Sequence, residues 1–491
     1  MKNNLIFLLF LTLISCSVFK QEKKIEISSL DTAKQYYKFI SKEDLHKNLS
    51  ILASDEYEGR ETTKKGQKMA AEYIKNHFEN LNISPGNKGK YFQSFNVNVT
   101  DFSRVVFVLN KDTLNIIDDF YMIGGTKDTN ILNKEIVDVN YGIQEDNFND
   151  YSNINVANKI VVLKQGVPDN IKVDFSWNNW RKKVKTAMKN GAIAVITVKN
   201  DYQKSVSILS DYLLKPEMKM HYDAKVRNNL IPNICISKDY YKNNIQNSKN
   251  FASLNIDIKY KAPSENVLGY IEGNENKDEL LVISAHYDHL GFDNGKVCNG
   301  ADDDGSGTVA LMSIAKAFQK AKDNGDGPKR SILFLSVSGE EKGLFGSKYY
   351  TDNPVYPLKN TIADLNIDMV GRKDSLHDDY NYIYIIGSDR ISNDLHVINE
   401  EVNKNHFRFY LDYTYNDEND PNHFYYRSDH YNFAKNGIPV IFYFSGVHED
   451  YHKPTDDVEK INFDKLEKLS RYIYLNAWEL VNRDERIKNR K

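Results

Sequence analysis

The chain has few cysteines, almost no net charge and no apolar run at its beginning long enough to cross a membrane. Its 491 residues include three cysteines and carry a formal net charge of −3 at pH 7. So small a charge gives no electrostatic basis for nucleic-acid binding, which is therefore not favoured. No internal repeat or low-complexity tract stands out. A composition of 41% hydrophobic and 27% charged residues is ordinary for a soluble globular protein, and the length suggests two or three domains.

The N-terminus has the pattern of an export signal. Lys2 precedes an apolar run from Leu5 to Ile14, which is too short for a bilayer span and typical of a signal-peptide core. The run ends in LISC, which resembles a bacterial lipobox, where cleavage leaves Cys16 as the lipidated first residue. The alternative is an ordinary signal with an incidental cysteine. We expect a lipoprotein signal peptide over 1–16, a polar, lysine-rich tether over 17–40, and a lipid-anchored protein of the bacterial cell envelope.

The remaining cysteines make no disulfide framework. If Cys16 carries lipid, only Cys235 and Cys298 are left, and two cysteines allow a single bridge. Cys298 lies five residues before Asp303, yet we expect it to be a small buried hydrophobic residue and no metal ligand.

Apolar spacing divides the rest of the chain into three parts. Residues 41–80 read as helix, with Ser41, three residues before Asp44, in a capping arrangement at its N-terminus. Short strands and loops follow from about 101 to 258, with expected strands at 105–109, 159–163, 193–198 and 231–236. From Glu265 onward, strands alternate with helices, which indicates a mainly parallel sheet covered on both faces. Expected strands lie at 280–285, 331–336, 363–367, 382–386 and 439–444, and expected helices at 307–321 and 463–481.

Several side chains that bind metals or transfer protons follow apolar runs in this last part. They lie in the strings SAHYDHLG, NGADDDGSG, SVSGEEKGL, LNIDMVGR and HEDYHKP, and they are His286, Asp303, Glu340, Glu341, Asp368 and His452. Taken singly, a histidine is usually a surface or core residue, and an acidic pair is usually a solvated face. Taken together, imidazole and carboxylate groups suit zinc, and carboxylates at strand ends converge in an open α/β sheet.

These strings together resemble the co-catalytic di-zinc aminopeptidases of clan MH, the family of bacterial leucyl aminopeptidases and glutamate carboxypeptidases. The resemblance covers residues 265–460, and the segment 51–74 resembles the start of many such peptidases. Segments such as NKIVVLKQG and IAVITVKND resemble the protease-associated (PA) domain often inserted into them. Such a domain is a spacer or, alternatively, a lid or wall of the substrate entrance.

The resemblance implies an α/β fold: a mainly parallel mixed sheet sandwiched by helices, the zinc exopeptidase fold, with a smaller, β-rich α+β PA domain inserted. The implied boundaries are 41–100 for the first part of the peptidase domain, 101–260 for the PA domain and 261–485 for the catalytic domain.

The resemblance also implies two Zn²⁺ ions per chain, with Asp303 bridging them. One ion would be held by Asp303, Glu341 and His452. The other would be held by His286, Asp303 and Asp368. Each ion would keep a position for water, as catalytic zinc requires.

Other residues receive roles around these ligands. Glu340 would be the general base. Asp288 would accept the second N–H of His286 and orient it. Tyr425 would donate a hydroxyl to the oxyanion, with Tyr426 as an alternative and aromatic core packing as another. The two ligand sets are complete without three further histidines, which are therefore not expected as ligands: His423, His430 and His448.

The sequence thus predicts an exported, lipid-anchored zinc aminopeptidase that acts on peptides. Carboxypeptidase, dipeptidase and glutaminyl cyclase activities are alternatives within the same family, and the triplet at 302–304 and the string NIDM resemble the aminopeptidases more. A peptidase-like binding protein without catalysis is a second alternative, although all six side chains are retained. A structural site with a single metal ion is a third alternative. Glu340, a carboxylate that is not needed as a ligand, argues against it.

Overall fold

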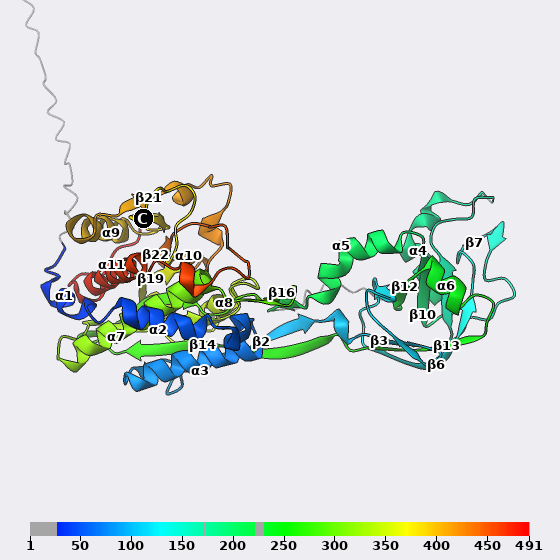
Figure 1. The fold of residues 1–491 in the computed structure, drawn as a ribbon, viewed down its shortest axis with the longest axis horizontal. Coiled ribbons are helices and arrows are strands. Elements are labelled where there is room, and N and C mark those ends of the chain that lie inside the picture. Colours follow the sequence, from blue (N-terminus) through cyan, green and yellow to red (C-terminus); the bar gives the residue numbers. More distant parts are fainter. Residues whose placement is uncertain (1–26, 171, 221–229, 491) are drawn as a thin grey trace, which may run out of the picture.

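The computed structural model describes residues 27–170, 172–220 and 230–490, so the expected signal peptide, Cys16 and the first part of the expected tether, 17–26, lie outside the described residues. The described chain forms two units side by side along the longest axis (Figure 1). One is built on a ten-stranded sheet and the other on an eight-stranded sheet. Because successive side chains of a strand point to opposite faces, the two faces of each sheet belong to different sets of buried residues.

The larger unit has the predicted mixed sheet, with parallel strands at its centre. The strand order is β11-β2-β14-β18-β15-β19-β22-β20-β21, and β1 pairs with β14. β15 pairs in parallel with β18 and β19, and β19 pairs in parallel with β22. The strand bounds are β1 Ser84–Pro85, β2 Phe92–Thr100, β11 Glu217–Lys219, β14 Lys259–Ile271, β15 Asn276–His286, β18 Arg330–Val337, β19 Thr361–Ile367, β20 Tyr382–Ile386, β21 Tyr410–Asp412 and β22 Val440–Phe444.

Helices cover both faces of this sheet because its central strands are apolar on both sides. In β15, Leu281 and Ile283 face one buried cluster, while Leu280 and Val282 face another. The first cluster includes residues of α1 (Asp31–Tyr37), α2 (Lys42–Leu52), α3 (Lys65–Asn80), α7 (Gly307–Asp323), α9 (Asn393–His406) and α11 (Phe463–Asn482). The second includes residues of α8 (Phe345–Asp352) and α10 (His430–Ala434). This is the predicted fold class.

The N-terminal part differs from the expectation in two places. The expected tether over 17–40 is wrong for its last residues, because α1 packs Ala33 and Tyr36 into the core of the larger unit. The expected helix over 41–80 is divided into α2 and α3 by a 3-10 segment at Asp55–Arg60. The predicted cap is present, since Ser41 Oγ accepts a hydrogen bond from Asp44 N at 3.3 Å.

The smaller unit has a sheet in the order β4-β3-β13-β6-β9-β10-β12-β5. Its strands are β3 Val106–Leu109, β4 Asp112–Leu114, β5 Phe120–Met122, β6 Thr129–Asp138, β9 Ile160–Lys164, β10 Ala194–Lys199, β12 Asn233–Ser237 and β13 Asn250–Ile256; its helices are α4 Trp180–Lys189, α5 Tyr202–Leu214 and α6 Lys238–Asn244. All four strands expected from the sequence in this region are present. Cys235 lies buried in β12 as a free cysteine.

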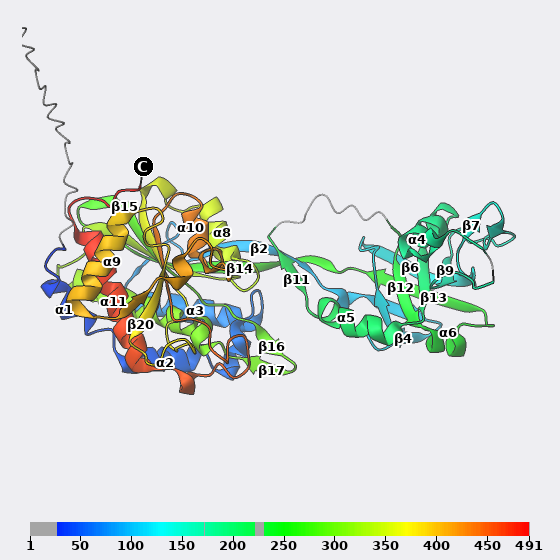
Figure 2. The same ribbon diagram turned by 90° about the horizontal axis from the view of Figure 1, so that it is seen from above.

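Two long antiparallel strands connect the units. β2 and β14 pair from Phe92↔Val267 to Thr100↔Lys259, and they run from the larger sheet toward the smaller unit (Figure 2). In both ribbon views the smaller unit stands beside the larger one and not over it.

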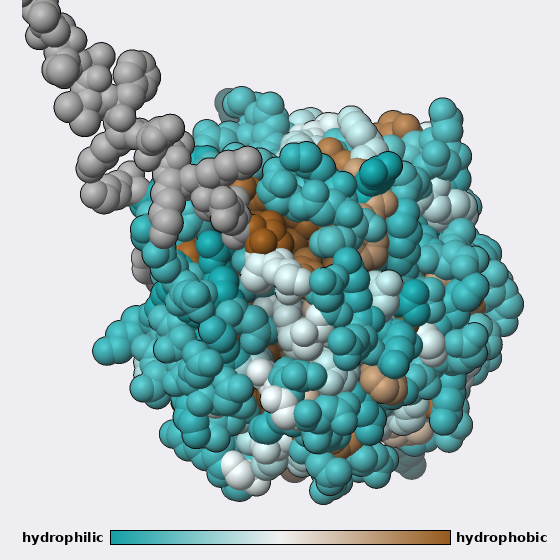
Figure 3. All heavy atoms as spheres, turned by 90° about the vertical axis from the view of Figure 1, so that its left-hand side faces the viewer, coloured by the Kyte–Doolittle hydropathy of each residue, from teal (hydrophilic) through white to brown (hydrophobic). Residues whose placement is uncertain are grey.

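Within the described residues, no helix combines the length and apolar character that a membrane crossing requires. The end of the larger unit that carries α1 and α9 is mostly hydrophilic, with small apolar areas (Figure 3).

Candidate metal centre

The predicted ligands converge at the carboxyl ends of neighbouring parallel strands. His286 is the last residue of β15, and Asp368 directly follows β19. Glu340 and Glu341 follow β18, and His452 lies in the loop after β22. Because β18, β15, β19 and β22 are adjacent in the sheet, residues far apart in sequence meet at one edge.

Asp303 stands between two groups of ligands. His286 Nε2 lies 3.3 Å from Asp303 Oδ1 and 3.6 Å from Asp368 Oδ1. On the other side, His452 Nε2 lies 3.2 Å from Asp303 Oδ2 and 3.2 Å from Glu341 Oε2. Each oxygen of Asp303 therefore belongs to a different group, as a bridging carboxylate requires.

These spacings fit two zinc ions. Ligand atoms at about 2.0–2.1 Å from a tetrahedral ion stand about 3.3 Å from one another. Asp303 Oδ2 and Glu341 Oε1 are buried, and each faces a histidine nitrogen without a well-aligned hydrogen bond, so each retains lone pairs for a cation. Burial acts to lower the pKa of His452, but the carboxylates of Asp303 and Glu341 prevail and raise it to about 10. The cluster thus favours positive charge at this place.

Glu340 has the environment of a proton-transfer group. Its Oε2 lies 4.0 Å from His286 Nε2, and its side chain is 12% exposed. Burial raises the pKa of Glu340 well above its usual range; His286 lowers it, and the nearby carboxylates of Glu341 and Asp429 raise it. A carboxylate with a raised pKa beside a candidate metal ligand is suited to take and return a proton.

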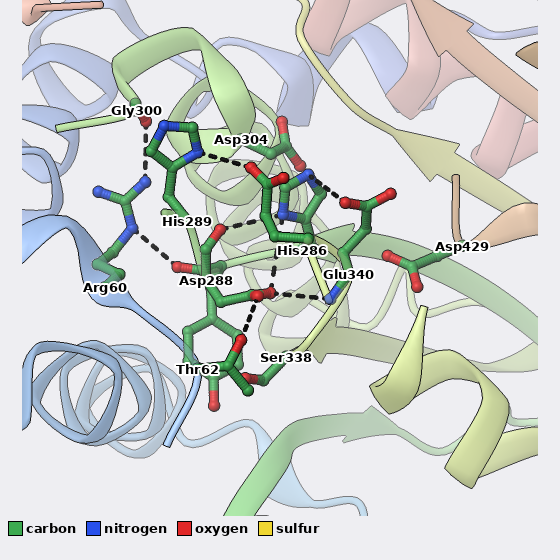
Figure 4. Close-up of polar contacts among 12 residues, drawn as sticks. Arg60, Thr62, His286, Asp288, His289, Gly300, Asp304, Ser338, Glu340 and Asp429 are labelled. Carbon is green, nitrogen blue, oxygen red and sulfur yellow. Dashed lines mark hydrogen bonds and ion pairs between the residues drawn. The ribbon is translucent and has the colours of Figure 1, made fainter. Parts of the chain in front are cut away.

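The structure corrects the predicted contact of Asp288. The Nδ1 atom of His286 lies 3.1 Å from the backbone carbonyl of Asp288, while the nearest carboxylate oxygen is 3.8 Å away. The carboxylate instead accepts hydrogen bonds from the backbone N–H of Glu340 (3.2 Å) and from Thr62 Oγ1 (2.7 Å) (Figure 4). Asp288 therefore orients His286 through its main chain and Glu340 through its side chain.

His289 is a site residue that the sequence analysis did not identify. It is fully buried, and its Nδ1 atom lies 2.8 Å from Glu341 Oε1. Gly300, at φ 55°, leaves room for it, since a Cβ there would lie 2.5 Å from His289 Cγ. The signal was available in SAHYDHLG, where this histidine follows His286 by three residues. His289, Asp303 and Glu341 form one of two groups of potential metal-binding atoms in the described chain.

Two tyrosines compete for the predicted oxyanion role. A cavity lies over the site and is lined in part by Asp303, Glu340 and Asp368. Tyr425 is not among the residues that line it, and its ring packs against Arg390, whose guanidinium carbon lies 4.0 Å from the ring centroid. Tyr451 does line the cavity, and its ring stacks on His452 at 3.8 Å. Burial raises the pKa of Tyr451, and the carboxylate of Asp303 adds to the effect. Tyr451, with a neutral hydroxyl beside these carboxylates, is therefore the stronger candidate.

The histidines that were not expected as ligands lie outside both groups. His448 pairs with Asp302 at 3.2 Å. His430 stacks on Phe442, and burial lowers its pKa to about 3, so it is neutral. His423 is exposed. Cys298 is buried, as expected.

Arg60 fixes the loops beneath the site. Its side chain is buried and donates to four carbonyls, those of Leu52 (2.7 Å), Tyr287 (2.8 Å), Asn299 (2.6 Å) and Gly300 (2.8 Å). This network explains why the segment around residues 51–74 belongs to the same domain as the metal centre.

The fold and the site resemble those of zinc metallopeptidases. More particularly, residues 266–476 match the model of peptidase family M28, and residues 132–242 match that of the PA domain.

The aminopeptidase YwaD of Bacillus subtilis is 24% identical over 245 residues, which are 48% of this chain and 49% of that protein. A probable glutamate carboxypeptidase of Arabidopsis thaliana, LAMP1, is 36% identical over 108 residues, 22% of this chain and 15% of that protein. The chain thus spans less than half of the length of these curated relatives. The solved structure of BSAP, a zinc aminopeptidase from Bacillus subtilis, is 20% identical with a TM-score of 0.50, covering 91% of this chain and 98% of that one, which supports the fold.

Proposed function

We propose that the protein is an aminopeptidase that uses two zinc ions to release N-terminal residues from peptides. The observation that carries this proposal is the position of Asp303, with one oxygen toward His286 and the other toward His452. Five side chains would hold the ions: His286, Asp303, Glu341, Asp368 and His452. Bound zinc would lower the pKa of water and polarise the scissile carbonyl.

The protein's own residues supply the proton transfer. Glu340, in its buried position, takes the proton of the attacking water and returns it to the leaving amine. The hydrogen bond from its backbone to Asp288 holds it in place. Tyr451, which lines the same cavity, donates its hydroxyl hydrogen to the developing oxyanion.

The proposal is tested with aminoacyl-p-nitroanilides and their N-acetylated counterparts, using protein that lacks residues 1–16. We expect hydrolysis of free-amine substrates only, abolished by a chelator. Glu340→Gln should lower kcat by about 10²–10⁴-fold while zinc content stays unchanged, because this residue transfers protons and binds no metal. Hydrolysis of C-terminally free, N-blocked peptides instead would favour the carboxypeptidase alternative, which the similarity to LAMP1 over 22% of the chain keeps open.

Export and anchoring belong to the same proposal. The string LISC, ending at Cys16, supports lipidation in the bacterial envelope. Labelled palmitate should be incorporated into the full-length protein and not into Cys16→Ser; labelling of both would contradict the anchor.

A further inference from the structure

The cavity over the candidate metal centre has walls of two kinds. Asp303, Glu340 and Asp368 form an acidic wall. The other described lining residues are Met369, Phe424, Arg427, Ser428, Phe442, Phe444, Val447 and Tyr451. Arg427 is the one cationic side chain among these described residues. It is therefore the only positive group that this wall offers to a substrate.

Arg427 is held in a defined position. Its backbone N–H donates to the carbonyl of Phe424 at 3.1 Å, and its guanidinium carbon lies 4.7 Å from the centroid of the Phe424 ring. The next residue, Ser428, donates its hydroxyl to Asp368 Oδ2 at 2.7 Å. The main chain at Arg427 is thus anchored next to a candidate zinc ligand.

The guanidinium of Arg427 is free to bind a ligand. Two other arginines of the larger unit are already engaged: Arg372 pairs with Asp450 at 3.1 Å, and Arg390 donates to the carbonyl of Asn416 at 2.7 Å. In the part of the chain that the structure describes, Arg427 forms no ion pair, and its side chain donates no hydrogen bond. Its residue is also exposed, so a substrate can reach it.

We propose that Arg427 forms a subsite that binds a carboxylate of the substrate, an inference that rests on the proposed peptidase function. A planar guanidinium matches a carboxylate with two parallel hydrogen bonds. Phe442 and Val447 line the same cavity and offer apolar surface to the rest of the substrate. The carboxylate could come from an acidic side chain at the end of the substrate or from the C-terminus of a short peptide.

The test compares substrates that differ only in charge. One arm uses Glu- and Gln-p-nitroanilide, and the other uses Leu-Leu and Leu-Leu-amide. In at least one arm, wild type should prefer the carboxylate, and Arg427→Gln should lower kcat/KM for it by about 10–100-fold, as expected for a bond between charged groups. The neutral partner should change less than about threefold. The arm that responds identifies the source of the carboxylate.

Variants and a binding measurement separate this subsite from a structural effect. Arg427→Lys, which keeps the charge and loses the two-pronged geometry, should retain part of the preference. Arg181→Gln, at an exposed arginine of the PA domain, should match wild type. Calorimetry should show that wild type binds either L-glutamate more tightly than L-glutamine or Leu-Leu more tightly than its amide, and that Arg427→Gln loses the difference.

The outcomes distinguish two kinds of failure. If wild type and Arg427→Gln both hydrolyse these substrates with the same preference for charge, the subsite is wrong while the peptidase function stands. If zinc-loaded wild type hydrolyses none of them, the proposed function itself fails.

Discussion

The backbone N–H of Glu340 donates a hydrogen bond to the carboxylate of Asp288, with an N–Oδ1 distance of 3.2 Å. Asp288 is fully buried, and its second oxygen accepts a hydrogen bond from Thr62. Its backbone carbonyl lies 3.1 Å from His286 Nδ1. One residue therefore orients both the candidate general base and a candidate zinc ligand.

Replacing Asp288 tests this relationship. Asp288→Ala should lower kcat by about 10–100-fold, since residues that orient a metal site typically contribute that much. Asp288→Asn should lose less, because its amide oxygen can still accept from Glu340. Asp293→Ala, at a partly exposed carboxylate on the β16–β17 hairpin (Gly291–Asp293 and Lys296–Cys298), should leave kcat unchanged. Equal activity of Asp288→Ala and wild type would show that this contact is dispensable.

His289 should contribute to metal affinity through Glu341. Its Nδ1 atom lies 2.8 Å from Glu341 Oε1, so His289→Ala would leave this carboxylate less fixed. We expect zinc affinity to fall by about 10–100-fold in chelator competition. His423→Ala removes an exposed histidine and serves as the control. Unchanged zinc affinity in His289→Ala would rule out this positioning role.

The two tyrosines can be separated by removing one hydroxyl at a time. Tyr451 lines the cavity, so Tyr451→Phe should reduce kcat by about 10²–10³-fold with zinc content retained. Tyr425→Phe should lower kcat by no more than a few fold, because the Tyr425 ring packs against Arg390. The reverse order would restore the role that the sequence analysis gave to Tyr425.

His77 should make stability depend on pH. Burial lowers its pKa to about 4, against an ordinary value of 6.5, so the folded state keeps it neutral. Between pH 6.5 and 4 the unfolded state binds more protons at this histidine than the folded state does. Lowering the pH therefore favours the unfolded state. The free energy of unfolding should decrease in this window, less steeply in His77→Gln. Urea denaturation at each pH measures the free energy of unfolding. The same dependence on pH in wild type and His77→Gln would contradict this role of His77.

The fold class and the general position of the site followed from the sequence because they depend on local patterns. Apolar runs such as Leu281 to Ala285 identify strands buried on both faces, and a carboxylate after such a run lies at a strand end. The resemblance then supplied the grouping of the ligands, with Asp303 between His286 and His452.

Side-chain contacts across the fold could not be read in the same way. The choice between the carboxylate and the carbonyl of Asp288 depends on distances of 3.8 and 3.1 Å, which no spacing encodes. His289 was missed because its partner Glu341 lies on another strand end. The helix at Asp31–Tyr37 is polar enough to read as a tether, and only its packing through Ala33 and Tyr36 shows otherwise.

The measurement that tests the central claim most directly is a titration of metal-free protein with zinc, followed by calorimetry and by hydrolysis of Leu-p-nitroanilide. The arrangement around Asp303 predicts binding of two zinc ions per chain, with full activity only after the second. His452→Ala, which removes a ligand from one group only, should bind one ion tightly. Saturation of wild type at one ion, with full activity, would contradict the two-zinc account.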